Sequence, residues 1–247
     1  MRIGKSANRG PRSKCGAIAC VFLFACTGAH SARGQQIDNA AAIARIDASV
    51  KARIDGIAQY TDTEHYKVFH GSEATQPIAE MVVKTTYRPE TGKHYDILSQ
   101  SGSGIALKFG LRPLLDNEKA INEPDKVAMS WINSANYEMA LNPGGPVAKE
   151  GRMCWELAIK PRRKAPNLVD GTLWVNASDF SIARLEGLSS KSPSMWSGPA
   201  HVMRQYMKMD GFAMATHARA ETDSMFLGKI VVTIDYEDYL IQPRPSR

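Results

Sequence analysis

Residues 153–160 read Met-Cys-Trp-Glu-Leu-Ala-Ile-Lys, and large apolar side chains recur at every second position. Successive side chains of a β-strand point to opposite faces of the sheet. One face of this stretch therefore carries Met153, Trp155, Leu157 and Ile159, and the other carries Cys154, Glu156, Ala158 and Lys160. A strand with one oily face is typical of an antiparallel sheet that buries one side.

Five more strand-like stretches follow toward the C-terminus. They are rich in β-branched and aromatic residues and cover residues 172–175, 182–188, 201–209, 216–222 and 226–239. Turn-forming residues separate them, at residues 161–164, 170–171, 178–179, 210–211 and 228. Strands joined by short turns pair as antiparallel neighbours, so one sheet is expected to account for this half of the chain.

The N-terminal half begins with a predicted helix and continues with three predicted strands. Over residues 37–57, apolar residues spaced three or four apart mark one helix face, at Ile43, Ile46, Val50 and Ile54. Asp38 or Asn39 can cap this helix, and Gly56 lies where it can end. The strands are predicted at residues 66–68, 78–87 and 94–98, with a turn at Thr91-Gly92.

Between residues 102 and 139 the alternation is lost. Apolar residues are scattered among polar ones and interrupted by Pro113 and Pro124, which favours short helices joined by loops. Together the segments predict an α+β fold, in which one large, strongly curved antiparallel sheet carries helices on one face. A body of this length can bury a sizeable core as a single domain, so residues 35–247 are predicted to form one domain.

The positive charge of the chain is concentrated at its start. The chain has 31 Lys and Arg against 25 Asp and Glu, a formal charge of +6, and residues 1–34 contain six basic and no acidic side chains. The remainder is formally neutral, which excludes the basic field of a nucleic-acid-binding protein. Residues 1–34 also join a basic start to a short apolar run at residues 15–26, as in a signal peptide.

Several ways of processing this signal fit the sequence. Cleavage after Ser31 or after Gly34 leaves an alanine three positions before the cut. Alternatively, residues 23–26 form a lipobox, and an acylated Cys26 anchors the protein to a membrane. The bulky Phe24 is unusual for a lipobox and favours a periplasmic or secreted protein without an anchor. An internal hydrophobic helix is a further interpretation of the same run.

Patterns for catalysis or metal binding are scarce. The histidines beyond the signal show no metal-ligand spacing, and they are His65, His70, His94, His201 and His217. Cys154 is the one cysteine beyond residue 34 and is expected to be a small buried hydrophobe. Asp235 and Glu237 share a strand face without a catalytic signature. The sequence predicts no enzyme, no metal site and no cofactor.

The unusual feature of the sequence is an apolar composition rich in flexible methionine side chains. Nine of the 11 methionines lie between Met129 and Met225, and methionine is flexible enough to line a site for a fluid ligand such as an acyl chain. The few predicted helices offer limited cover for a wide sheet, which favours a cleft between the two. The residues predicted to bind lipid there are Met153, Trp155, Leu157, Trp174, Met203, Met207, Ile230, Val232 and Ile234. An ordinary core is the competing interpretation for each of them.

Several stretches carry a likeness to a known family. They are residues 85–89 (TTYRP), 151–152 (GR), 155–161 (WELAIKP), 170–176 (DGTLWVN), 179–187 (DFSIARLEG) and 206–211 (YMKMDG), with Pro193-Ser194, Trp196 and the closing residues 236–239 (YEDY). Through them the chain resembles the periplasmic lipoprotein-carrier superfamily of LolA and LolB, in particular the outer-membrane lipoprotein-sorting proteins, over most of residues 40–240.

The resemblance implies an open half-barrel whose helices cover its concave face, as a lid over a hydrophobic cavity for lipid chains. It also implies that a cavity arginine is linked to lid opening, and Arg88 is the arginine in a matching motif. The implied function is an envelope carrier of lipid or lipoprotein acyl chains, including lipoprotein sorting to the outer membrane.

Two other functions compete with the carrier. The first is a periplasmic sensor or interaction protein, which would bind a protein partner through edge strands and residues 189–197. The second is an enzyme that acts on lipids, and it ranks last because no reactive pair of side chains can be assigned.

Overall fold

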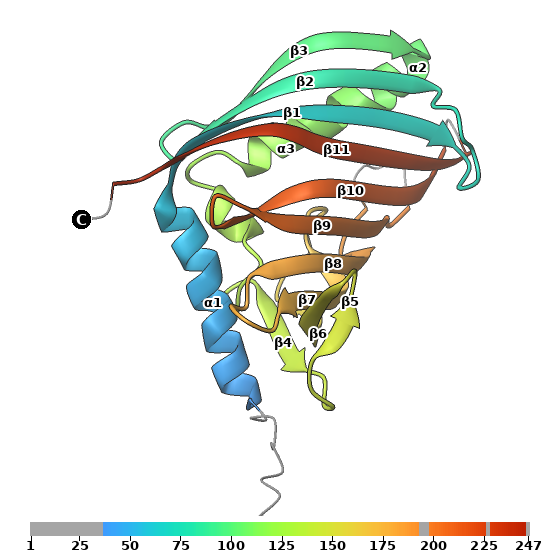
Figure 1. Ribbon diagram of the computed structural model, residues 1–247. Coiled ribbons are helices and arrows are strands. Elements are labelled where there is room, and N and C mark those ends of the chain that lie inside the picture. Colours follow the sequence, from blue (N-terminus) through green and yellow to red (C-terminus); the bar gives the residue numbers. More distant parts are fainter. Residues whose placement is uncertain (1–36, 193–197, 226–227, 246–247) are drawn as a thin grey trace, which may run out of the picture. The chain divides into compact units, whose positions relative to one another are not determined.

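One antiparallel sheet organises the chain (Figure 1). The computed structural model describes residues 37–192, 198–225 and 228–245, so the predicted signal peptide, the motif residues Pro193, Ser194 and Trp196, and the start of the predicted strand 226–239 lie outside it. The strands are β1 (Ile57–His70), β2 (Ala79–Arg88), β3 (Gly92–Gly102), β4 (Tyr137–Leu141), β5 (Val147–Lys149), β6 (Arg152–Pro161), β7 (Val169–Asn176), β8 (Ile182–Ser189), β9 (His201–Met209), β10 (Phe212–Ser224) and β11 (Gly228–Pro243).

The strand order confirms the predicted sheet. It runs β3-β2-β1-β11-β10-β9-β8-β7-β6-β4, with β5 paired to β6. All of these pairs are antiparallel, and β1 pairs with β11, so the first and last strands meet in the interior of the sheet. The end strands β3 and β4 do not pair with each other within the described residues, so the sheet is open.

Helix α1 (Asn39–Gly56) forms as predicted. The Asp38 carboxylate accepts a hydrogen bond of 2.7 Å from the amide of Ala41, which satisfies one of the free N–H groups at the helix start. Ala42 and Ile46 are completely buried, so this side of α1 packs on the sheet and the opposite side is exposed.

The segment after β3 forms the predicted short helices. They are α2 (Gly104–Ala106), the π-helical turn η1 (Leu107–Leu111), α3 (Arg112–Ile121) and the 3-10 turn η2 (Val127–Ser130). Leu111 and Leu115 are buried against strands β1 and β2, and α3 lies behind these strands in Figure 1. None of the described helices has the length and apolar character needed to cross a membrane.

Two apolar clusters fill the space between helices and sheet. The α1 cluster packs Ala42 and Ile46 against β4, β6, β7 and β8, and its buried members include Tyr137, Trp155, Leu157, Ile159, Leu173 and Leu185. The α3 cluster packs Leu111 and Leu115 against β1, β2, β10 and β11, and its buried members include Tyr66, Val68, Met81, Val83, Ala218 and Ile234. The helices therefore cover one face of the sheet, as expected.

Three elements differ from the prediction. Strand β4 begins in the segment that was expected to hold only helices and loops, β5 lies beyond it where no strand was predicted, and β1 extends over 14 residues instead of residues 66–68. The buried face of β1 carries Asp62 and Glu64 between its apolar residues. These charges break the hydrophobic alternation from which strands are recognised.

The predicted turn at Asp170-Gly171 is also wrong, because both residues belong to β7. Gly171 lies opposite Gly187 of β8. A Cβ atom on Gly171 would lie 2.1 Å from the carbonyl oxygen of Glu186, a distance that no side chain tolerates. The glycine therefore permits a close approach of two backbones within the sheet, which a sequence pattern does not distinguish from a turn.

Candidate ligand-binding cavity

A cavity of about 410 Å³ lies between the helices and the covered face of the sheet. Its volume falls within the range of about 300–1,000 Å³ that is usual for small-molecule sites. The helical wall consists of residues from α1, α3, η2 and the following loop: Ser49, Val50, Ala52, Arg53, Ile54, Glu118, Ile121, Asn122, Val127, Ser130, Trp131 and Ile132. The sheet wall includes Tyr60, Tyr87, Ile182, Leu185, Arg204, Tyr206, Phe212, Ala215, Tyr236 and Tyr239.

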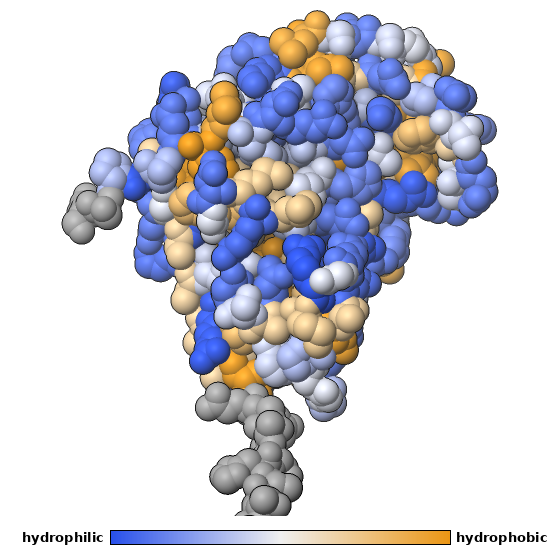
Figure 2. Space-filling model, viewed as in Figure 1, coloured by the Kyte–Doolittle hydropathy of each residue, from blue (hydrophilic) through white to orange (hydrophobic). Residues whose placement is uncertain are grey.

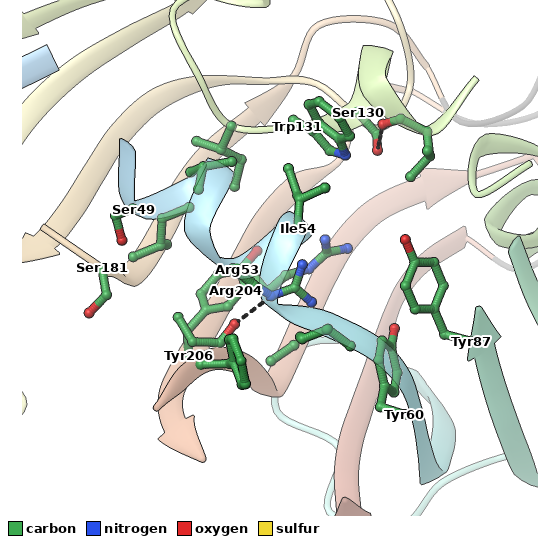
Figure 3. Close-up of a pocket in the computed structure, with 18 of the residues that line it drawn as sticks. Ser49, Arg53, Ile54, Tyr60, Tyr87, Ser130, Trp131, Ser181, Arg204 and Tyr206 are labelled. Atoms are coloured by element: carbon green, nitrogen blue, oxygen red, sulfur yellow. Dashed lines mark hydrogen bonds between the residues drawn. The ribbon is translucent and has the colours of Figure 1, made fainter. Parts of the chain in front are cut away.

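Aromatic and aliphatic side chains form much of this lining. Tyr60 stacks on Tyr87 with ring centroids 5.0 Å apart and packs on Tyr239 at 5.9 Å. Figure 3 shows Ile54 and Trp131 on the helical side of the cavity, and Tyr60 and Tyr87 on the sheet side. An elongated apolar ligand can therefore contact side chains on both walls.

Charged side chains interrupt the apolar lining. Four cations reach the cavity, Arg53, Lys93, Arg204 and Lys208, together with the two acids Glu118 and Asp179. An ion pair joins Lys208 to Asp179, and a looser one of 3.7 Å joins Arg204 to Glu118 of α3. Residues far apart in the sequence supply these pairs, so the sheet and the helices together build the polar part of the site.

Next to the cavity, β1 buries a charge pair. Glu64 is 1% exposed and accepts hydrogen bonds from the Tyr66 hydroxyl and from the Lys93 ammonium group of β3, the latter at 3.3 Å. Burial alone would lower the pKa of Lys93, but the Glu64 carboxylate together with Tyr60, Tyr95 and Glu118 outweighs it and holds this pKa well above its ordinary value. A buried charge with a close counter-charge and a further hydrogen bond is tolerated, whereas one without a partner is costly.

Asp62 lies one pleat away from Glu64 on the same face of β1. It is completely buried, and neither of its carboxylate oxygens has a hydrogen-bond partner among the described residues. The hydroxyl of Thr85, directly opposite on β2, is likewise buried without a partner. Burial raises the pKa of Asp62 to about 7, against the opposing charge of Lys93. Much of Asp62 is therefore protonated at neutral pH.

A second hollow of about 840 Å³ adjoins the cavity. Met153 and Met207 line it together with Glu150, Arg152, Gln205 and Thr216. Asp179, Tyr206 and Lys208 line both spaces. The Lys208–Asp179 ion pair thus lies at the boundary between the cavity and this hollow.

None of the nine residues predicted to bind lipid lines the 410 Å³ cavity. Trp155 and Leu157 belong to the α1 cluster, and the buried Trp155 indole N–H has no partner in the described part of the chain. Ile230 and Ile234 are buried, and Val232 packs against the α3 cluster. Trp174 packs with Cys154 and Ala183 on the other face of the sheet and donates a 3.0 Å hydrogen bond to Glu156.

The two faces of β9 have the reverse of the expected roles. The prediction placed the oily face with Met203 and Met207 toward the ligand, but Arg204 and Tyr206 of the opposite face line the cavity. Met207 is 56% exposed, and Met203 lines neither hollow. Alternation separates the two faces correctly, but it does not tell which face the helices cover.

Arg88 also lies away from the cavity. It is exposed at the end of β2 and donates a 2.7 Å hydrogen bond to the half-buried Gln59 side chain. The cavity arginines are Arg53 and Arg204, which no motif in the sequence had indicated.

One close histidine–carboxylate pair lies outside the cavity lining. The Nδ1 atom of His217 lies 2.7 Å from the Asp235 carboxylate, and Lys67 lies 3.7 Å from the same carboxylate. Neither histidine nor cysteine occurs among the described residues that line the cavity. Within the described ranges, no group of three or more His, Cys, Asp and Glu side chains could hold a metal ion.

Comparisons with known proteins find similarity at the level of structure. No model of a protein family matches the chain, and no curated protein matches its sequence. Similar solved structures include a LolA superfamily protein from Nitrosomonas europaea, which is 11% identical with a TM-score of 0.45 over 82% of this chain and 94% of that chain.

Two further solved structures show the same level of similarity. An outer membrane lipoprotein-sorting protein domain from Vibrio parahaemolyticus is 12% identical with a TM-score of 0.44, over 80% of this chain and 91% of that chain. A DUF1329 family protein from Desulfovibrio piger is 14% identical with a TM-score of 0.42, over 82% of this chain and 94% of that chain.

Proposed function

We propose that this protein is a non-enzymatic binding protein that carries the acyl chain of a lipid or lipoprotein in the cavity between α1 and the sheet. The single observation that carries this proposal is the cavity itself, with its volume of about 410 Å³ and apolar side chains on both walls. Its supporting wall residues are Val50, Ile54, Trp131, Ile132, Leu185 and Phe212. They replace the methionine-rich face as the proposed contacts of the chain.

Apolar contact supplies enough free energy for such a carrier. Burying one methylene contributes about 0.8 kcal/mol, so a chain of about ten methylenes contributes about 8 kcal/mol before the costs of ordering it. A single acyl chain can therefore be held by apolar contact alone.

We further propose that the protein works in the periplasm or is secreted, and that its partners are lipids or acylated lipoproteins. The proposal rests on the basic and apolar composition of residues 1–34. Mass analysis of the protein from its native host tests it: an N-terminus at residue 32 or 35 is expected after cleavage, and a lipid-modified Cys26 would instead indicate an anchored form. An unprocessed chain would contradict export.

Lipid binding is tested by native mass spectrometry. The purified protein is delipidated and titrated with fatty acids and lysophospholipids of eight to eighteen carbons, and we expect one chain per protein. Ala215→Trp places an indole from the sheet wall into the cavity and is expected to abolish uptake. Absence of any bound lipid, before and after titration, would overturn the proposal.

The matched control is Leu188→Trp. Leu188 is 53% exposed and does not line the cavity, so this variant is expected to take up lipid like the parent protein. Equal loss of uptake in both variants would show that the tryptophan acts through general damage to the fold, and thermal unfolding of both variants detects that damage directly.

A second candidate function is an interaction protein that binds a partner along its sheet edge. It is favoured by the end strand β3, which exposes Ile97 and Leu98. Unpaired strand edges readily accept another strand. The substitution Leu98→Lys is expected to reduce capture of such a partner and to leave lipid uptake unchanged, which distinguishes the two functions.

A further inference from the structure

The cations of the cavity exceed its acids, and the surplus falls on Arg53. Lys93 is paired with Glu64, Lys208 with Asp179, and Arg204 with Glu118. Arg53 of α1 donates a 2.8 Å hydrogen bond from Nε to the carbonyl oxygen of Ala213. None of the ion pairs among the described residues includes Arg53, so its guanidinium group is without a carboxylate partner.

Arg204 adds unused hydrogen-bonding capacity at the same cavity. Its pairing distance to Glu118 is 3.7 Å, longer than a direct hydrogen bond, and its buried Nε atom has no partner in the described residues. Figure 3 shows the guanidinium groups of Arg53, from α1, and Arg204, from β9, both directed into the centre of the cavity. One guanidinium group from each of two opposite walls can therefore donate hydrogen bonds into the same space.

A ligand with a negative head group would complete this arrangement. Guanidinium groups bind carboxylates and phosphates through paired, charge-assisted hydrogen bonds. A cation in a partly enclosed cavity gains more from a counter-charge than one in water does. The neighbouring Ile54 and Phe212 side chains offer no partner for a charge but suit an apolar chain. A ligand that pairs with the arginines and also contacts the apolar side chains is an amphiphile with one acidic head group.

We infer that Arg53 and Arg204 form a head-group site, and that the ligand of this cavity is a single-chain acidic amphiphile, with its carboxylate or phosphate on the two arginines and its chain along the apolar wall. This inference rests on the proposed lipid binding and specifies its substrate class. The arginines select the acid by charge, and the apolar wall selects the chain.

Four ligands with the same twelve-carbon chain test the site by isothermal titration calorimetry on the full-length protein: dodecanoate, dodecyl phosphate, dodecanol and dodecyltrimethylammonium. We expect at least one of the two anions to bind about tenfold more tightly than dodecanol, since hydrogen bonds to charged groups contribute more than neutral ones. The cationic ligand is expected to bind more weakly than dodecanol. Equal affinity for all four would overturn the head-group site and leave the proposed carrier intact, whereas binding of none would contradict the carrier itself.

Arg53→Gln is the discriminating variant. It is expected to lower the affinity for the preferred anion to that of dodecanol, without changing the affinity for dodecanol. Arg45→Gln is the matched control, because Arg45 lies on the same helix, contacts the Phe180 ring and does not line the cavity. A loss of affinity for dodecanol and the anion alike would contradict the assignment of Arg53.

Free anions identify the source of the charge. Acetate and inorganic phosphate at millimolar concentration are expected to compete weakly or not at all with dodecanoate, because they lack the chain. If inorganic phosphate binds as tightly as the amphiphile, the site serves a soluble anion and the inference is wrong. Arg53→Lys keeps the positive charge but loses the planar guanidinium group that donates paired hydrogen bonds. We expect this variant to recover part of the preference for the anion.

Discussion

The covered face of the sheet buries two kinds of region. Under α1, the buried side chains contributed by β6, β7 and β8 are apolar apart from Ser189, with Leu157 and Leu173 completely enclosed. Near the other end, β1 and β2 bury Asp62, Glu64 and Thr85 beside Lys93. The first region gains free energy from burial, and the second costs free energy unless every charge keeps its partner. The cavity lies where the two meet.

The two buried regions are stabilised in different ways. Hydrophobic burial under α1 needs only volume and packing, whereas the charged region depends on individual contacts. Buried polar groups without partners are uncommon and each needs an explanation. Among the described residues Asp62, Thr85 and the Arg204 Nε atom are of this kind near the cavity, and the Trp155 indole N–H is one in the α1 cluster. Hydrophilic residues predominate on the face seen in Figure 2, with hydrophobic ones in separate patches.

The largest expected effect comes from breaking the charge pair in the second region. Lys93→Met leaves the Glu64 carboxylate buried without its cation, which is expected to lower the free energy of unfolding by about 5 kcal/mol. Urea unfolding measures this change. In the double variant Lys93→Met/Glu64→Gln most of the loss should be recovered, since no charge remains, and a double variant as unstable as Lys93→Met would contradict the explanation.

A slightly smaller effect is expected for the way in which Asp62 makes the free energy of unfolding depend on pH. Its folded-state pKa of about 7 lies above the ordinary value of 3.8, so the folded protein holds this proton more tightly than the unfolded chain. The contribution to stability is therefore highest below the ordinary pKa and falls as the pH rises toward 7. Each tenfold change in proton affinity corresponds to about 1.4 kcal/mol, so the total change approaches about 4 kcal/mol.

Asp62→Asn removes this dependence. The difference in unfolding free energy between variant and parent is expected to shift in favour of the variant by that amount from about pH 4 to about pH 8. Urea unfolding at a series of pH values gives the two curves, and their difference isolates the contribution of Asp62. Parallel curves would show that Asp62 does not titrate in this range.

A third prediction tests the apolar region. Leu157→Ala removes a completely buried side chain from the α1 cluster and is expected to cost about 3 kcal/mol, independent of pH. Met153→Ala on the same strand is the control, because Met153 is 55% exposed. Should the stability difference between Leu157→Ala and the parent protein shift with pH as that of Asp62→Asn does, the two regions would not be independent.

The smallest effect is expected on the outer face of β9. Met207→Ala alters an exposed side chain that lines only the second hollow, and the change in unfolding free energy should stay under about 0.5 kcal/mol. Lipid uptake measured by native mass spectrometry should not change either. A marked loss of uptake would restore the methionine-rich face as a ligand site.

Much of the fold could be predicted from periodicity. The helix at α1, the short helices after β3 and the strands of the C-terminal half all follow from apolar spacing and turn residues. Prediction failed where polar residues occupy buried positions, as Asp62 and Glu64 do in β1, and where Gly171 serves close packing. A charged residue between apolar ones fits either a loop or a buried polar position in a strand. A glycine fits either a turn or a close approach of two strands, and the local sequence does not separate these possibilities.

The candidate site was less accessible to prediction. Alternation in residues 201–209 separates Met203 and Met207 from Arg204 and Tyr206 correctly, but both faces contain apolar atoms. The signal that could have located the site was the pair of charges at Asp62 and Glu64 in a strand of otherwise core-like residues. Buried charges of this kind call for partners such as Lys93, which comes from another strand.

By itself, the sequence determined the first helix and most of the strands, which side chains share a face, and that the body of the chain is neutral, because these properties depend on local spacing and composition. Only the tertiary structure decided which face the helices cover and which side chains meet in the cavity. Arg53 and Arg204 are 151 positions apart, and nothing in local spacing relates them. Their meeting follows from how α1 packs across the sheet.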